Sequence, residues 1–309
     1  GFQRLVKAGF DPRAMASFFN RLQQATRTQD SKTPGYLRTH PLTYERIAEA
    51  QDRAFSSPYR QVPDSIDYLL VRALLRSYDG TTEDAVAILN KQLESTRPEQ
   101  RNAARYGLAA TRLRAGKLKE AWADIQALDK ADFHHPMVEG LAGQILLQSG
   151  EYAAAKTRYE AALARYPNHL QLIYDYPRNL IKARDYAAAA SFCEQQLTRR
   201  RGDWTLHEIA AEAYAATGRQ TLSHYHLGEA YSLQGNLREA IQQLEIAARA
   251  QDSGEQAQTQ AETRLAALRR QQLEERRERS SFGGGRGLTV TPATSTYPES
   301  RPLRSFTKP

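Results

Sequence analysis

The sequence predicts an all-α protein built from repeated pairs of helices. Alanine makes up 46 of the 309 residues, which favours helices that pack closely. A glycine followed five residues later by alanine recurs through the middle of the chain, for example at Gly116 and Gly150. No apolar run approaches the roughly 18 residues of a membrane span, so the helices are expected to pack on one another.

The turn glycines set the period of the repeat. Gly116 and Gly150 lie 34 residues apart, and degenerate copies at Arg184 and Gly218 continue the spacing. A helix pair of this length is the tetratricopeptide repeat (TPR), whose stacked copies form an α-solenoid with a concave binding face. We therefore expect four parts: the end of another domain over 1–60, four to five TPRs over 61–250, a polar capping helix over 251–279 and a disordered tail over 280–309.

Three departures from the repeat carry further expectations. Pro177 stands where a small residue is expected at a helix crossing, so that helix should be kinked or restarted. Gly235 follows Gly218 by half a period, so one helix over about 220–234 should serve two repeats. Cys193 takes the position of a large apolar residue, which predicts a packing role.

Charge and cysteine content exclude several classes of protein. The net charge is +8, but residues 264–309 carry ten basic and four acidic side chains, so the rest of the chain is nearly neutral. A folded basic face for nucleic acid is therefore disfavoured. The single cysteine excludes an intramolecular disulfide and any metal site with several cysteines.

The first sixty residues differ from the repeats. Gly9 ends one helix, and Asp11 with Pro12 begins the next, whose residues Met15 and Phe18 open an apolar stripe continued by Phe19 and Leu22. The stripe needs a partner, and Ile47, Ala50 and Ala54 of a following helix supply part of one. We expect the remainder in a domain upstream of Gly1.

Two motifs in this region carry a family resemblance. Residues 9–15 read Gly-Phe-Asp-Pro-Arg-Ala-Met, and residues 37–41 read Leu-Arg-Thr-His-Pro, with Arg46 and Ile47 following. This resembles the end of the peptidase domain in HExxH zinc metallopeptidases of the HtpX and CAAX-prenyl-protease type. A TPR array directly after that domain is similar to the β-barrel assembly-enhancing branch of the family.

The resemblance implies a zinc endopeptidase of the bacterial periplasm that degrades stalled outer-membrane proteins or helps to mature them. The TPR face would bind these unfolded clients or the assembly machinery, with no nucleic acid and at most peripheral membrane contact. The 309 residues contain no His-Glu-x-x-His, and the third-ligand glutamate is expected just before Gly1. The chain alone is therefore expected to be inactive and to hold no zinc tightly, although the intact parent would use it.

The resemblance also assigns roles to two residues. His40 matches an accessory zinc ligand that occupies the water position and silences the enzyme; the plainer interpretation is an exposed loop histidine. Arg46 matches the family's arginine, with a structural or site-lining role.

Four side chains on the first helices of the repeats fall at positions that commonly face the TPR groove: Tyr106, Tyr174, Arg178 and Glu208. They are candidates for peptide binding, but they could equally be solvated or contact neighbouring repeats. His224 and His226 point to different faces of one helix and cannot chelate together. His169 and His207 read as surface or capping residues. The alternative function for the whole chain is a non-enzymatic TPR adaptor.

Overall fold

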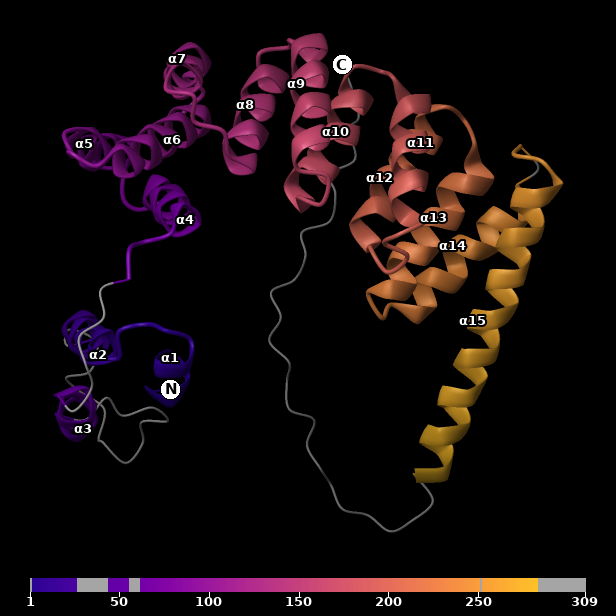
Figure 1. Ribbon diagram of the computed structural model, residues 1–309. Coiled ribbons are helices and arrows are strands. Elements are labelled where there is room, and N and C mark those ends of the chain that lie inside the picture. Colours follow the sequence, from indigo (N-terminus) through magenta and orange to yellow (C-terminus); the bar gives the residue numbers. More distant parts are fainter. Residues whose placement is uncertain (1, 27–43, 56–61, 251, 283–309) are drawn as a thin grey trace. The chain divides into compact units, whose positions relative to one another are not determined.

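The computed structural model describes residues 2–26, 44–55, 62–250 and 252–282, and every regular element in these ranges is an α-helix (Figure 1). The helices are α1 (Phe2–Lys7), α2 (Arg13–Thr26), α3 (Tyr44–Phe55), α4 (Ile66–Ser77), α5 (Thr82–Leu93), α6 (Pro98–Arg114), α7 (Leu118–Lys130), α8 (Pro136–Gln148), α9 (Tyr152–Arg165), α10 (Leu170–Lys182), α11 (Tyr186–Leu197), α12 (Trp204–Ala216), α13 (Gln220–Leu233), α14 (Leu237–Arg249) and α15 (Glu255–Phe282). The all-α TPR fold predicted from the sequence is confirmed.

The chain divides into two compact units, Gly1–Ile145 and Leu146–Pro309. The division falls inside α8, so it cuts across the region expected to hold the repeats. The expected boundaries at residues 60 and 250 stay predictions. The expected tail over 280–309 lies outside the described residues apart from the last residues of α15.

In the first unit, the repeat core forms around α6, which packs against α4, α5 and α7. Leu70, Leu89, Leu108 and Ile125 are at most 1% exposed and belong to one apolar cluster. A Cβ atom built on Gly107 of α6 would lie 2.8 Å from Leu89 Cδ2. Only glycine therefore permits this close approach of α6 to its neighbours.

The two helices before the repeats pack on each other. The α3 residues expected to face α2 are buried, with Ile47, Ala50 and Ala54 between 4% and 6% exposed. On α2, however, Phe18 is 58% exposed, and Ala16, two residues earlier, is buried instead. The apolar stripe of α2 is thus only partly covered within the described residues.

In the second unit, consecutive helices from α9 to α15 pack in sequence order. Helix α13 packs against both α12 and α14, as each helix from α10 to α14 packs against its two neighbours in sequence, so its expected membership of two repeats stays a prediction. A Cβ built on Gly228 of α13 would lie 2.7 Å from Leu244 Cγ of α14, so this crossing also requires glycine. Helix α15 covers α14 with Leu265 and Leu268, and it extends beyond residue 279 to Phe282.

The turns inside the helix pairs have a left-handed residue at one repeated position. Gly116, Gly150 and Gly218 have φ angles of 73°, 79° and 75°. Arg184, at the same position of its repeat, has a φ of 62°, a conformation that is strained for a residue with a Cβ. The turn of this repeat therefore keeps the left-handed conformation although arginine replaces the glycine.

Helix α10 excludes one of the two outcomes expected at Pro177. It runs without interruption from Leu170 to Lys182 with Pro177 inside it, so the helix is not restarted. Pro177 is buried within α10, where it removes one backbone donor of the helix.

Candidate functional site

Two residues were predicted to lie at a zinc site, and the structure describes the side chain of neither. His40 falls outside the described residues. Arg46 belongs to α3, but its side chain is not among those described. The zinc-silencing role of His40 and the site-lining role of Arg46 therefore stay predictions.

Tyr106 requires a correction. Its side chain is 2% exposed and belongs to the apolar cluster of the first unit. Burial, with a smaller contribution from Tyr78, raises the pKa of its hydroxyl far above the ordinary value. The expectation that this ring projects into a binding groove is wrong, because the ring fills the core between helices.

Tyr174 links two consecutive repeats of the second unit. Its hydroxyl donates to Oδ2 of Asp203 at 2.8 Å, while Oδ1 of Asp203 accepts from the backbone N–H of Leu206 and caps α12. Desolvation and then this hydrogen bond raise the pKa of Tyr174. The side chain is half-buried, so it joins α10 to the start of α12 and stays partly accessible to solvent.

Arg178 and Glu208 remain open to solvent on the same two helices. The Arg178 guanidinium lies 3.7 Å from the Asp175 carboxylate on its own helix, a surface pair of small energetic value. Glu208 of α12 accepts from Nε2 of Gln234 at 3.1 Å. Since α10 contacts α12, three of the four predicted side chains lie on neighbouring first helices.

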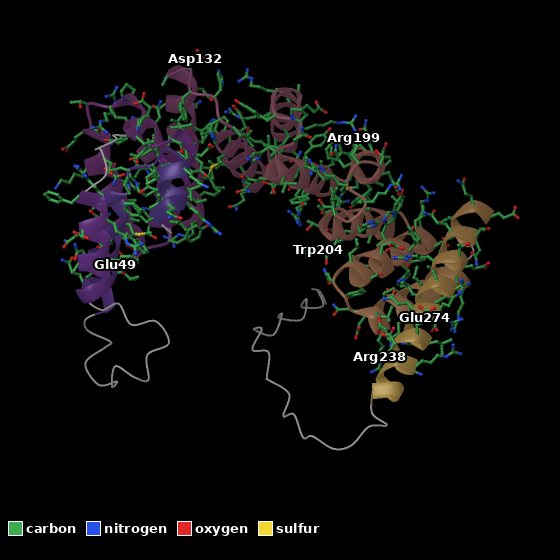
Figure 2. The ribbon with its side chains drawn as sticks, turned by 60° about the horizontal axis from the view of Figure 1, so that its bottom comes forward. Glu49, Asp132, Arg199, Trp204, Arg238 and Glu274 are labelled. Atoms are coloured by element: carbon green, nitrogen blue, oxygen red, sulfur yellow. The ribbon has the colours of Figure 1, made fainter. Side chains whose placement is uncertain are left out.

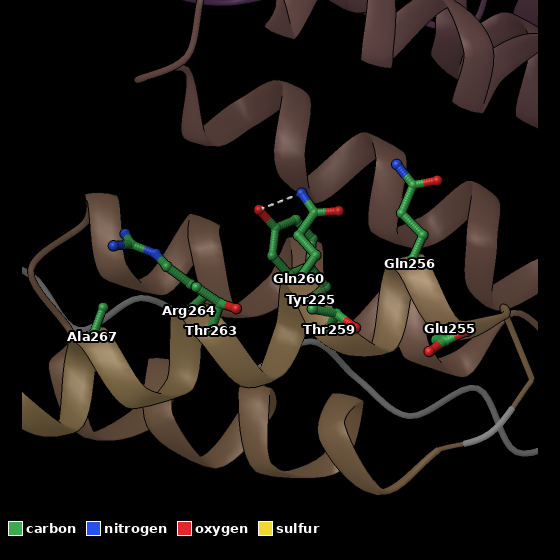
Figure 3. Close-up of a pocket in the computed structure, with 8 residues that line it drawn as sticks. All are labelled: Tyr225, Glu255, Gln256, Thr259, Gln260, Thr263, Arg264 and Ala267. Atoms are coloured by element: carbon green, nitrogen blue, oxygen red, sulfur yellow. Dashed lines mark hydrogen bonds between the residues drawn. The ribbon is translucent and has the colours of Figure 1, made fainter.

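A groove of about 800 Å³ lies along the last helices of the second unit (Figure 3). Seven of its eight lining residues come from α15 and one from α13: Tyr225, Glu255, Gln256, Thr259, Gln260, Thr263, Arg264 and Ala267. Within it, Nε2 of Gln260 donates to the hydroxyl of Tyr225 at 2.9 Å. The groove was not predicted, since the polar composition of this helix indicated only a cap.

The one cation lining this groove is neutralised. Arg264 donates from Nε to Oε1 of Glu229 at 2.5 Å and from Nη2 to Oε2 at 3.1 Å, a two-pronged pair between α15 and α13. Nη2 also lies 3.2 Å from the hydroxyl oxygen of Ser232. Because both charges are occupied, Arg264 adds little net charge to the groove, whose lining also includes the carboxylate of Glu255.

A buried polar cluster in α11, α12 and α13 was missed by sequence reasoning. The Nδ1 atoms of His207 and His226 lie 2.9 Å apart, and Nε2 of His226 lies 2.9 Å from Oε1 of Glu194. The Tyr214 hydroxyl donates to the same oxygen at 3.2 Å, and its ring stacks on His226. His207 is 7% exposed and His226 is 2% exposed, so His207 is not a surface or capping residue.

Electrostatics in this cluster hold His207 neutral. Burial, followed by the neighbouring His226, lowers the pKa of His207 from 6.5 to about 4. The hydrogen bond from His226 lowers the pKa of the Glu194 carboxyl. The repeat register is the signal that could have identified His207, because it falls 34 residues after Ile173, a fully buried position.

Cys193 behaves as the sequence predicts. It is fully buried, and burial raises the pKa of its thiol to about 12. A thiol that stays protonated at neutral pH is a poor nucleophile. Its role is packing.

The described ranges hold neither a cluster of metal ligands nor a helix able to cross a membrane. In 2–26, 44–55, 62–250 and 252–282, no group of three or more His, Cys, Asp or Glu side chains could hold a metal ion. None of the helices in these ranges combines the length and the apolar character that a bilayer crossing needs.

Comparison with known proteins identifies a family. A family model described as a tetratricopeptide repeat-like domain matches residues 15–185, which is more than half of the chain. A protein of Yersinia pestis named β-barrel assembly-enhancing protease is 29% identical over 272 residues, which cover 87% of this chain and 56% of that protein. The protein of the same name from Escherichia coli K12 is 28% identical over 277 residues, covering 89% of this chain and 56% of its own length. The chain therefore spans about half the length of these curated relatives.

Solved structures with a similar arrangement include TPR proteins. The crystal structure of YrrB, described as a TPR protein with an unusual peptide-binding site, aligns with a TM-score of 0.44 and 18% identity, covering 58% of this chain and 91% of that one. A TPR protein from Parabacteroides merdae aligns with a TM-score of 0.43 and 13% identity, covering 79% of this chain and 97% of that one.

Proposed function

Because the chain belongs to the tetratricopeptide repeat-like domain family, we propose that it is the polypeptide-binding part of an envelope zinc metalloendopeptidase of the β-barrel assembly-enhancing kind. In this proposal, the intact protein works in the bacterial periplasm. It degrades stalled outer-membrane proteins or assists their assembly. The repeats bind the unfolded client or the assembly machinery.

The length of the similarity to the curated proteases carries the proposal. The alignment to the Yersinia pestis protein covers 272 residues, whereas the repeats expected over 61–250 account for only 190. An alignment of that length must extend beyond the repeats. This favours a protease part over a free-standing adaptor, for which only the repeats would be shared.

The chemistry of peptide cleavage is not assigned to the described residues. They contain no three-ligand metal group, and the 309 residues contain no His-Glu-x-x-His. Zinc in the intact protein would polarise a water for attack on the peptide carbonyl. The contribution proposed for this chain is His40, as a reversible extra ligand that displaces the water, together with Arg46 near the site.

The exposed groups on α10 and α12 are the proposed client contacts. Tyr174 offers an aromatic edge, while Arg178 and Glu208 offer opposite charges on neighbouring first helices. This combination suits a polypeptide of mixed composition.

A binding and cleavage assay on this chain tests the proposal. We expect it to bind a urea-unfolded outer-membrane β-barrel protein on dilution, to ignore the folded protein and to leave casein uncut when zinc is added. An Arg178→Ala/Glu208→Ala double variant should bind the client several-fold more weakly. The matched control is Arg199→Ala/Glu274→Ala, with the same residue types at exposed positions outside α10 and α12 (Figure 2). Robust casein cleavage with stoichiometric bound zinc, or no preference for unfolded client, would contradict the proposal.

The role of His40 is tested in the intact parent protein. His40→Ala should raise proteolysis while zinc content stays constant, because the water position is freed. Unchanged or reduced proteolysis with zinc retained would contradict the silencing role.

A further inference from the structure

The loops of the second unit lie in two groups at opposite ends of its helices. Short loops join consecutive helices that pack on each other, which makes neighbouring helices antiparallel. The loops after α9, α11 and α13 therefore lie at one end, where the Tyr174 hydroxyl near the start of α10 donates to Asp203 just before α12. The turns before α9, α11, α13 and α15 lie at the other end, where the backbone N–H of Thr221 donates to Asp252.

The two ends differ in charge. Each loop is counted here from the last residue of one helix to the first residue of the next. The loops after α9, α11 and α13, at 165–170, 197–204 and 233–237, carry four arginines and one aspartate. The turns of the other end, at 148–152, 182–186, 216–220 and 249–255, carry four basic and four acidic residues. We call the first group of loops, with its net charge of +3, the basic end; its charged residues are Arg165, Arg199, Arg200, Arg201 and Asp203.

Most of the positive charge at the basic end is open to solution. Asp203 already accepts hydrogen bonds from the Tyr174 hydroxyl and from the backbone N–H of Leu206. The side chains of Arg165, Arg199 and Arg201 are exposed, and within the ranges that the structure describes they form no ion pair. These guanidinium groups are therefore available to an external anion.

Large apolar side chains are exposed at the same end. Leu170, Trp204 and Leu233 are 48%, 44% and 40% exposed. Leu170 and Trp204 are the first residues of α10 and α12, and Leu233 is the last residue of α13. At the opposite turns, Tyr152 at 36% is the one exposed large apolar side chain that the structure describes. The basic end thus combines free cations with exposed apolar surface.

This combination complements the surface of an anionic lipid bilayer. Arginine side chains close to such a surface are attracted by its negative potential. Tryptophan is most stable at the level of the headgroups, and aliphatic side chains gain by entering the boundary with the acyl chains. An acidic protein or a nucleic acid would also attract the arginines, but neither offers an apolar layer to Leu170 and Leu233.

We propose that the basic end of the second unit docks on the surface of an anionic lipid bilayer. The arginines contact the headgroup phosphates, and Trp204 enters the headgroup layer together with Leu170 and Leu233. The contact is shallow and reversible, because a few loop and helix-end residues supply it. This inference does not depend on the proposed function.

The first arm of the test measures binding of the full chain to vesicles. Trp122→Phe leaves Trp204 as the sole tryptophan. At 50 mM NaCl, sedimentation should show binding to vesicles of phosphatidylcholine with 30% phosphatidylglycerol that is about tenfold or more tighter than to phosphatidylcholine alone. Raising NaCl to 500 mM should weaken this binding about tenfold or more. Trp204 emission should shift to shorter wavelength on binding, and lipids brominated near the headgroup should quench it.

The second arm removes the charges and the aromatic ring in turn. Arg199→Gln/Arg201→Gln should weaken binding to the anionic vesicles about tenfold or more, because each arginine near the surface contributes about fivefold. Trp204→Ser in the parent chain should weaken it several-fold with the circular dichroism spectrum unchanged. The matched control is Lys182→Gln/Arg249→Gln, which removes two exposed positive charges at the opposite end and should change binding less than about twofold.

Several results would overturn the inference. These are equal binding to both kinds of vesicle, no binding to the anionic vesicles, equal losses in the two double variants, and unchanged Trp204 emission in the bound chain. Displacement from the vesicles by a 20-nucleotide oligo(dT) at equal phosphate concentration would assign the basic end to single-stranded nucleic acid instead. Displacement by 10 mM inorganic phosphate at constant ionic strength would assign it to a free anion. Either displacement would overturn the inference as well.

Discussion

Acidification should destabilise the second unit through His207, and the size of the effect follows from its surroundings. The imidazole is buried between α12 and α13, with His226, Glu194 and Asp203 as its ionisable neighbours. Its pKa is about 4 in the folded chain against 6.5 ordinarily, because burial penalises the charged form. The folded state therefore binds this proton less readily than the unfolded state does.

The sign and magnitude of the change in stability follow from the difference in proton binding between the folded and unfolded states. The stabilisation due to neutral His207 is fully present above pH 6.5 and is lost as the pH falls toward 4. At 1.36 kcal/mol per pKa unit, the whole shift corresponds to about 3 kcal/mol, of which about 2 kcal/mol is lost between pH 7 and pH 4.5. The lowered pKa of Glu194 acts in the same direction, since its stabilisation is lost as the pH falls through its folded pKa.

Urea unfolding followed by Trp204 fluorescence measures this effect locally. Trp204 is the first residue of α12, three residues before His207, and Trp122→Phe leaves it as the sole tryptophan (Figure 2). The free energy of unfolding should fall by about 2 kcal/mol from pH 7 to pH 4.5 in this background. In His207→Leu the absolute stability at pH 7 is lower, because the bond to His226 is lost, but most of the pH dependence should disappear.

His224→Gln is the matched control. His224 lies on α13 two residues before His226 and bonds Gln243 outside the cluster, so its removal should leave the pH dependence intact. If His207→Leu and the parent lose the same free energy between pH 7 and pH 4.5, His207 is not the titrating group and the reasoning is refuted.

Three further predictions concern the repeats. Arg184→Gly should raise the free energy of urea unfolding of the second unit by about 1 kcal/mol, because the φ of 62° strains a residue with a Cβ. Gly228→Ala should lower it by about 1–2 kcal/mol, because overpacking against Leu244 exceeds the gain in helix propensity. Cys193 should resist iodoacetamide at pH 7.5 in the folded chain and react within minutes in urea, since burial raises the pKa of its thiol to about 12.

Each of these has an outcome that contradicts it. A destabilised Arg184→Gly would show that the arginine side chain contributes more than its backbone strain takes away. An unchanged or more stable Gly228→Ala would show that α13 and α14 can separate without loss. Rapid labelling of folded Cys193, read by mass spectrometry, would show that α11 opens readily.

The helices and their crossings were predictable because they depend on residues close in sequence. The 34-residue spacing located the turns from Gly116 to Gly218, and the half-period placed a further turn at Gly235, where φ is also positive. Cys193 could be assigned to packing because the positions 34 and 68 residues before it, Tyr159 and Ile125, are buried as well. Such patterns reflect local backbone geometry and repeated contacts between neighbouring helices.

The side-chain chemistry was less predictable. Tyr106 was expected in a groove, yet it fills a core, because a small rotation of its helix decides which face is covered. The sequence shows His207 and His226 only beside residues of their own helices, whereas their hydrogen-bond partners come from adjacent helices. The period indicates which positions recur, but not which polar groups meet across repeats.

The sequence by itself determined the helix-pair architecture and the resemblance of residues 9–47 to a peptidase end, since both are written in short-range patterns. Tertiary structure alone decided that His207 is buried and neutral, that Arg264 is neutralised by Glu229, and that α15 lines a groove with Tyr225. The physical reason is that burial, pKa and groove shape depend on the packing of α11 to α15 against one another, over sequence separations that no local pattern encodes.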